Sequence, residues 1–153
     1  MSLDFNGKVA IVTGSGGGIG KGYALELAKR GAKIVVNDLG GAVDGTGGSV
    51  SAAEAVVQEI ESNGGEAIAN GANVSVQSEV KSMVEDAVKK WGKVDILINN
   101  AGILRDKSFG KMEWSDFEAV INVHLIGSAL CAHSVFPVML SLIHISEPTR
   151  HRL

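Results

Sequence analysis

The sequence is poor in cysteine and in blocks of like charge, and each scarcity excludes a class of protein. One cysteine among 153 residues forms no internal disulfide and cannot build a zinc site alone. Cys131 lies in an apolar stretch with helical pattern, which indicates a buried structural thiol rather than a nucleophile. The net charge is −3 without a run of one sign, so nothing indicates binding to nucleic acid or to an anionic membrane.

Long apolar runs and targeting signals are also missing. No uninterrupted apolar run reaches the roughly 20 residues that a membrane span needs, and residues 1–8 contain no signal-peptide core. With 45% hydrophobic residues and 20 glycines, the composition is typical of a globular chain. These features predict a soluble intracellular protein with one domain that is large enough for a core.

Short β-branched runs alternate along the chain with stretches of helical period. The pattern predicts an α/β fold, in which a parallel sheet of about four strands carries helices on both faces. A doubly wound dinucleotide fold normally has six or more strands, so the sheet is expected to be partial. A capping box, Ser115 and Glu118, is expected to open the last helix. The expected strands are residues 8–13, 33–37, 66–70 and 94–98, and the expected helices are residues 18–30, 51–63, 76–91 and 115–136.

A glycine-rich segment, TGSGGGIG at residues 13–20, joins the first expected strand to the first expected helix. Gly14 allows a tight turn, Gly18 lets the backbone approach a pyrophosphate, and Gly20 lets the helix pack close to the strand. The helix N-terminus offers free N–H groups and a positive dipole end to an anion. The context of strand, turn and helix therefore predicts a dinucleotide site, with a generic tight turn as the alternative.

A P-loop for nucleoside triphosphates is the other interpretation, because Gly20 and Lys21 resemble its Gly-Lys pair. That motif requires glycine at position 15 and serine or threonine at position 22, where this sequence has Ser15 and Gly22. The spacing therefore excludes a P-loop.

Asp38 follows the second expected strand, 20 residues after Gly18. A carboxylate there can accept hydrogen bonds from both hydroxyls of an adenosine ribose and would repel the 2′-phosphate of NADP. No arginine stands beside it, and no basic residue lies between Gly14 and Gly18. The sequence therefore favours NAD over NADP, with a solvated or capping carboxylate as the alternative for Asp38.

Two motifs identify a family. The segment at residues 13–20 resembles the TGxxxGxG motif of short-chain dehydrogenases/reductases, and the segment at residues 99–102, Asn-Asn-Ala-Gly, resembles their NNAG motif. They lie in register over about 90 residues, and the resemblance extends from Leu3 to about Met139. The segments at residues 37–41, 102–106 and 123–125 further resemble the (3R)-hydroxyacyl-CoA dehydrogenase domain of type 2 peroxisomal multifunctional enzymes.

This resemblance implies an NAD-dependent oxidoreductase with a Rossmann fold that oxidises a (3R)-hydroxyacyl-CoA to the 3-ketoacyl-CoA in fatty acid β-oxidation. The alternatives are a 3-oxoacyl-carrier-protein reductase, which usually takes NADP, and a non-catalytic dinucleotide-binding fragment. By analogy the compartment is the peroxisome, with the cytoplasm as the alternative. Family members form homo-oligomers through the helix at residues 117–136 and the helix after it, so the oligomeric state of this chain is left open.

The resemblance also assigns cofactor-binding residues, and no metal site. The pyrophosphate residues are Gly14, Ser15, Gly18, Ile19 and Gly20, the ribose residue is Asp38, the adenine residues are Asn73 and Val74, and the residues beside the nicotinamide ribose are Asn100, Ala101 and Gly102.

The catalytic set of the family is Asn, Ser, Tyr and Lys, and most of it has no match here. His124 occupies the Asn position, with Asn122 two residues earlier. The role implied there is a backbone carbonyl, which histidine also supplies, and the alternative is a merely hydrogen-bonded core histidine. The family's Tyr precedes its Lys by four residues, whereas the one tyrosine here, Tyr23, precedes Leu27. No fifth strand can be recognised, so this chain alone is expected to be inactive.

The end of the chain, LSLIHISEPTR at residues 140–150, resembles a translated sequencing adapter rather than the family. We therefore expect residues 1–139 to be the N-terminal part of the Rossmann domain and residues 140–153 to be a non-native tail that breaks the helical pattern. The alternative is a divergent C-terminus. His144 and His151 would need a third partner to bind a metal.

Overall fold

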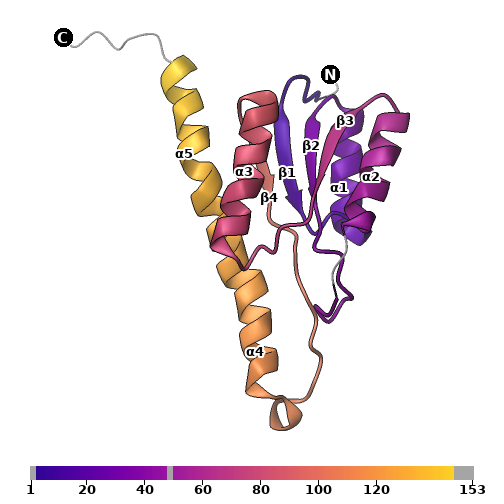
Figure 1. The fold of residues 1–153 in the computed structure, drawn as a ribbon, viewed down its shortest axis with the longest axis vertical. Helices are drawn as coiled ribbons and strands as arrows, with labels where there is room; N and C mark the ends of the chain where they lie inside the picture. The colour runs from indigo at the N-terminus through magenta and orange to yellow at the C-terminus, as the bar shows by residue number, and fades with distance from the viewer. Residues whose placement is uncertain (1–2, 48–49, 147–153) are drawn as a thin grey trace, which may run out of the picture.

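The computed structural model describes residues 3–47 and 50–146, in which strands and helices alternate as the sequence predicts. Figure 1 shows the sheet between two layers of helices. The strands are β1 (Val9–Thr13), β2 (Lys33–Asn37), β3 (Glu66–Asn70) and β4 (Ile96–Ile98). The helices are α1 (Gly18–Lys29), α2 (Ser51–Ser62), α3 (Gln77–Trp91), the 3-10 helix η1 (Phe109–Lys111), α4 (Trp114–Ile121), the π-helical turn η2 (Asn122–Gly127) and α5 (Ser128–Ser146).

The four strands form one parallel sheet in the order β3-β2-β1-β4. In register, Thr13 at the end of β1 pairs with Asn37 at the end of β2. Because the strands are parallel, their carboxyl ends lie at one edge, and the order reverses between β1 and β4. A crevice at this point is where open α/β sheets bind their ligands.

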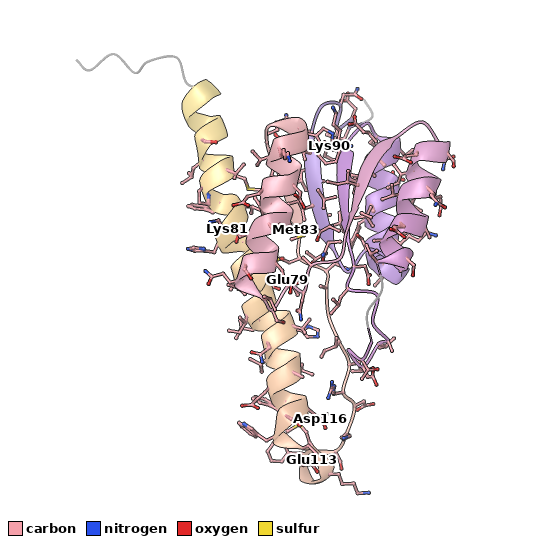
Figure 2. The ribbon with its side chains drawn as sticks, viewed as in Figure 1. Glu79, Lys81, Met83, Lys90, Glu113 and Asp116 are labelled. Carbon is pink, nitrogen blue, oxygen red and sulfur yellow. The ribbon has the colours of Figure 1, made fainter. Side chains whose placement is uncertain are left out.

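Each face of the sheet has its own hydrophobic core, and residues alternate between them along the strands. Ala10 and Val12 of β1 pack toward α1 and α2, whereas Ile11 packs toward α3 and α5. Met83 of α3, labelled in Figure 2, belongs to the second core. Cys131 of α5 is 1% exposed there, and burial raises the pKa of its thiol to about 11, which confirms the structural interpretation.

The expected start of the last helix is wrong by one residue. The helix α4 begins at Trp114 after Glu113, without a side-chain cap, so Ser115 lies inside the first turn and forms no capping box. The first turn is fixed instead by Asp116, whose backbone N–H donates to Glu113 O and whose carboxylate is buried among basic side chains. An ion-paired residue of the first turn therefore anchors this helix.

The expected end near Phe136 is also wrong, because α5 continues to Ser146 and contains Pro137. Leucine and methionine are good helix formers, so a helix can continue where its apolar face no longer follows a clear period. Residues 140–146 therefore do not break the helix. Residues 147–153, with Pro148 and His151, lie outside the described residues, and the non-native tail stays a prediction.

By length and composition, the continuous helical stretch Trp114–Ser141 could cross a membrane, with a mean hydropathy of 1.6 in its most apolar window. The sequence has no uninterrupted apolar run of that length, and the two observations agree because a windowed average tolerates the polar residues that break a run. The signal is weak, since the stretch contains the ion-paired Asp116 and packs on α3 through Cys131 and Val135.

Candidate functional site

A cavity of about 480 Å³ lies at the carboxyl edge of the sheet, where the turn after β1 and the segments after β2, β3 and β4 meet. A larger groove, about 1210 Å³, lies beside Asn6, Arg30 and Gly65 and contains none of the expected site residues. Eight of the twelve expected site residues line the carboxyl-edge cavity, namely Gly14, Gly18, Asp38, Asn73, Val74, Asn100, Ala101 and Gly102.

The turn after β1 and the end of β4 are tied together by hydrogen bonds. Asn100 Nδ2 donates to Thr13 O at 3.0 Å and to Gly14 O at 2.9 Å. Thr13 Oγ1 accepts from the backbone N–H groups of Asn100 and Ala101, both at 3.0 Å. The amide of Asn100 therefore shapes the turn, in addition to lining the cavity.

Several positions of this turn require glycine, and Gly14 and Gly20 show two different reasons. Gly14 has φ +63°, and a Cβ on it would lie 2.8 Å from Ala101 Cα. A Cβ on Gly20 would collide with Gly14 O and the Asn100 side chain. Close packing of α1 against the ends of β1 and β4 therefore excludes side chains at both places.

The N-terminus of α1 is suited to an anion. Gly17 precedes the helix and supplies no side-chain cap, and the first turn contains no acidic residue. A Cβ on Gly18 would meet nothing within 4 Å, so the space before the helix is open. Uncapped N–H groups and the positive end of the helix dipole would hold the diphosphate of a dinucleotide here.

Asp38 at the end of β2 is half-buried in the cavity wall. Its Oδ2 accepts from Gly16 N at 2.8 Å, and its Oδ1 accepts from Gly40 N at 2.7 Å. A carboxylate oxygen has two lone pairs, so each oxygen can accept a further hydrogen bond from a ribose hydroxyl. The two backbone bonds hold the carboxylate in place beside the glycine-rich turn.

Asn73 and Val74 lie where β3 leads toward α3. Asn73 Oδ1 accepts from Ser75 N at 2.9 Å, and its backbone N–H donates to Glu79 Oε2 at 2.7 Å. Val74 is buried, and a Cβ on Gly127 would lie 2.8 Å from its Cγ2. Both residues line the cavity, and their backbone is held by these contacts.

Four expected residues do not line the cavity. The Ser15 hydroxyl donates to Val12 O at 2.7 Å, and its backbone N–H donates to Asn37 O at 2.9 Å, so both groups hold the turn. Gly20 packs against the turn as described, and Ile19 is 72% exposed on α1. The fourth is His124.

His124 lies in η2, and its ring packs on Gly102. Its Nε2 is 3.1 Å from Ile103 N and 2.9 Å from Ile103 O, so it accepts from the amide or donates to the carbonyl, depending on the tautomer. Within the described residues, η2 is the only π-helical turn, and such turns bend a helix. The histidine thus fixes the segment after β4, while a catalytic role stays a prediction.

Three charged residues near the site, Arg105, Lys107 and Asp116, are not among the expected site residues. Asp116 accepts from Arg105 Nη1 at 2.9 Å and from Lys107 Nζ at 2.8 Å. These hydrogen bonds, first from Lys107 and then from Arg105, lower the pKa of Asp116 to about 2. A local sequence pattern cannot predict this cluster of charged residues. The cluster forms only when α4 packs beside the segment after β4.

Among residues 3–47 and 50–141, no group of three or more His, Cys, Asp and Glu side chains could hold a metal ion. Tyr23 is 47% exposed on α1 and does not line the cavity. The cavity offers backbone groups and one carboxylate, which are groups that can bind a dinucleotide.

In a comparison with known proteins, residues 8–146 of the chain match the family model for short chain dehydrogenases. The chain is 49% identical to the peroxisomal hydratase-dehydrogenase-epimerase of Saccharomyces cerevisiae over 92% of its length, but it covers 15% of that protein. It is 57% identical to peroxisomal multifunctional enzyme A of Dictyostelium discoideum, over 84% of the chain and 28% of that protein. It is 45% identical to the 3-oxoacyl-[acyl-carrier-protein] reductase of Synechocystis, over 87% of the chain and 51% of that protein.

A solved structure shows the same fold. It is a 7α-hydroxysteroid dehydrogenase complexed with NADH and 7-oxo glycochenodeoxycholic acid, and it is 35% identical with a TM-score of 0.81 over 91% of this chain and 51% of that chain. The described chain thus spans about half of such a protein. The match over nearly all of the sequence and the Rossmann-like sheet agree, and the chain belongs to the short-chain dehydrogenase/reductase family of oxidoreductases.

Proposed function

We propose that this chain binds NAD and forms the cofactor-binding half of a dehydrogenase that oxidises a (3R)-hydroxyacyl-CoA to the 3-ketoacyl-CoA. The single observation that supports NAD is the Asp38 carboxylate, which lines the cavity and is fixed by Gly16 N and Gly40 N. A negative charge at the end of β2 favours ribose hydroxyls and disfavours a 2′-phosphate. The acyl-CoA substrate rests on the resemblance of residues 37–41, 102–106 and 123–125. The names of the yeast and amoebal relatives support a peroxisomal location.

The residues present fit the cofactor. The uncapped start of α1 would hold the diphosphate, Asp38 the adenosine ribose, and Asn73 with Val74 the adenine. Ala101 and Gly102 would lie along the nicotinamide ribose. When bound, the nicotinamide accepts a hydride from the carbon that carries the substrate hydroxyl. These residues orient the dinucleotide, and none of them removes the hydroxyl proton.

Binding is tested by titrating the purified 153-residue chain with NADH and NADPH and following cofactor fluorescence. We expect NADH to bind more tightly, and Asp38→Asn to weaken NADH more than NADPH, because the charge that repels the 2′-phosphate is lost. Equal affinity of the wild-type chain for both cofactors would contradict the assignment of NAD. No binding of either would contradict the proposed function.

Turnover is a separate question, because general base catalysis and stabilisation of the reacting oxygen contribute several orders of magnitude in rate. We propose that this chain alone is inactive, since Tyr23 is followed by Leu27 four residues later and does not line the cavity. With a (3R)-hydroxyacyl-CoA and NAD, we expect no rate above background. Clear turnover would show that another group of the chain supplies the proton transfer.

A 3-oxoacyl-carrier-protein reductase is the second candidate, supported by the 45% identity to the Synechocystis reductase. The cofactor preference separates the two candidates. A clear preference for NADPH would favour the reductase, whereas the contacts of Asp38 favour NADH.

A further inference from the structure

The glycine-rich segment after β2 forms a compact flap, which we define as residues 39–47. Ala42 N donates to Thr46 O at 2.8 Å, and Gly45 N donates to Ala42 O at 2.9 Å. Asp44 Oδ1 accepts from both the backbone N–H and the hydroxyl of Thr46, and these hydrogen bonds lower the pKa of its carboxyl group. The flap is therefore a folded unit rather than an open loop.

The flap contributes one wall of the cavity, and the segment after β4 contributes another. Flap residues that line the cavity include Ala42, Val43 and Gly45, and lining residues of the segment after β4 include Gly102 and Ile103. Both segments thus lie against the space assigned above to the dinucleotide.

Two hydrogen bonds and one packing contact join these walls. Leu104 N donates to Val43 O at 2.9 Å, and Arg105 Nε donates to Asp44 O at 2.9 Å. Gly45 has φ +85°, and a Cβ on it would lie 3.1 Å from Ile103 Cγ2, so the flap backbone approaches this side chain closely. The contacts join the two segments that line the cavity.

Arg105 links the bridge to the rest of the fold. While its Nε holds the flap, its Nη1 donates to the buried carboxylate of Asp116 on α4. Asp116, labelled in Figure 2, lies near the start of α4, and Lys107 binds its other oxygen. Because guanidinium is a planar fork, one side chain satisfies both acceptors, which a single ammonium group does less well.

We propose that Arg105 is a positioning residue that latches the flap over the dinucleotide and sets the rate at which the cofactor enters and leaves. The proposal rests on the proposed binding of NAD. Opening the flap requires breaking the bonds from Arg105 to Asp44 O and from Leu104 to Val43 O. The anchor on α4 keeps the guanidinium in place while the flap moves.

The test compares Arg105→Ala, Arg105→Lys and the control Lys107→Ala in the 153-residue chain. Lys107→Ala removes one partner of Asp116 but leaves the bond to Asp44 O. Stopped-flow fluorescence measures NADH dissociation, and hydrogen exchange measures protection of the Leu104, Gly45 and Thr46 amides.

We expect Arg105→Ala to accelerate NADH dissociation about tenfold and to reduce protection of these amides. Arg105→Lys should give much of this effect, although it keeps a positive charge beside Asp116, whereas Lys107→Ala should change neither readout. If wild-type chain binds NADH and Arg105→Ala leaves dissociation unchanged, or if Lys107→Ala accelerates it equally, the latch is overturned and the proposed function stands. If neither the wild-type chain nor any variant binds NADH, both the proposed function and the latch are contradicted, whatever the exchange data show.

Discussion

At the scale of single residues, the site depends on side chains that have their partners before any ligand arrives. Asp116 is a clear case, because its carboxylate is 7% exposed and has one basic partner on each oxygen. A buried charge is tolerated only when its hydrogen bonds are satisfied, and removing one partner leaves an uncompensated group. The ionised form of Asp116 therefore belongs to the folded state.

The depressed pKa of Asp116 predicts a pH dependence. Since the folded pKa of about 2 is below the unfolded value near 4, the ionised carboxylate stabilises the fold above about pH 4, and this contribution is lost as the pH falls toward 2. We expect Asp116→Asn to lower the free energy of unfolding at pH 7, and the difference from wild type to shrink at pH 3. Urea denaturation at both pH values measures it, with the exposed Asp86→Asn on α3 as control. A difference that stays constant between the two pH values would contradict the prediction.

Cys131 is buried in its neutral form, whereas Asp116 is buried in its ionised form. Burial raises its pKa to about 11, so about one thiol in a thousand is ionised at pH 8. We expect a disulfide reagent such as DTNB to label the native chain very slowly and to label it at once in denaturant. Rapid labelling under native conditions would show that α5 separates from α3 readily.

At the scale of elements, α1 combines glycines that are required with one that is not. A Cβ on Gly20 would meet Gly14 O and Asn100, whereas a Cβ on Gly22 would meet nothing within 4 Å. The helix is thus pressed against the turn on one side and open on another.

These two glycines give a matched pair of variants. We expect Gly20→Ala to destabilise the fold by about 1–3 kcal/mol through overpacking and to weaken dinucleotide binding. Gly22→Ala should stabilise it by about 0.5–1 kcal/mol, because alanine loses less backbone entropy in a helix. Thermal and urea unfolding measure both. A Gly20→Ala variant as stable as Gly22→Ala would mean that the turn can move away from α1.

Strands and glycine spacing could be predicted from the sequence, because both are local. The buried run at Lys33–Asn37 matches β2 residue for residue, and the turn at Gly14 lies where its motif predicts. The use of individual atoms could not be predicted. Ser15 and Asn100 are expected at the cofactor site, and no motif indicates that their side chains also hold the turn through hydrogen bonds to Val12, Thr13 and Gly14.

Contacts between loops were equally out of reach. Arg105 contacts the flap and α4 only because the sheet brings together the segments that follow β2 and β4. Neither segment has a periodic pattern that would predict this contact. The extension of α5 past Phe136 was missed because periodicity detects a face that is buried, not the helix itself.

At the scale of the whole molecule, several large apolar side chains are exposed along one helical stretch. The helices α4 and α5 and the turn η2 between them run along the outside of the fold in Figure 1. Trp114 and Phe117 stack at 4.9 Å between ring centroids and are both exposed. Large exposed side chains along this stretch are Trp114, Phe117, Leu125, Ile126, Phe136 and Leu140. Apolar side chains exposed together on one stretch favour interaction with another apolar surface.

The sheet adds a second apolar surface at β4. This strand has three residues, Ile96–Ile98, and pairs only with β1 within the described chain. An unpaired apolar edge can template the addition of another strand. Both surfaces favour association with a second copy of the chain.

We therefore expect the 153-residue chain to self-associate, with an average mass that rises with concentration in sedimentation velocity. Because the contact is apolar, association should persist at high ionic strength. Phe136→Gln, at a side chain 60% exposed on α5, should shift the distribution toward the monomer. Leu3→Gln, 75% exposed near the N-terminus, is the matched control and should leave it unchanged. A chain that stays monomeric over a hundredfold range of concentration, or equal effects of the two variants, would show that the exposed face of α4 and α5 does not drive association.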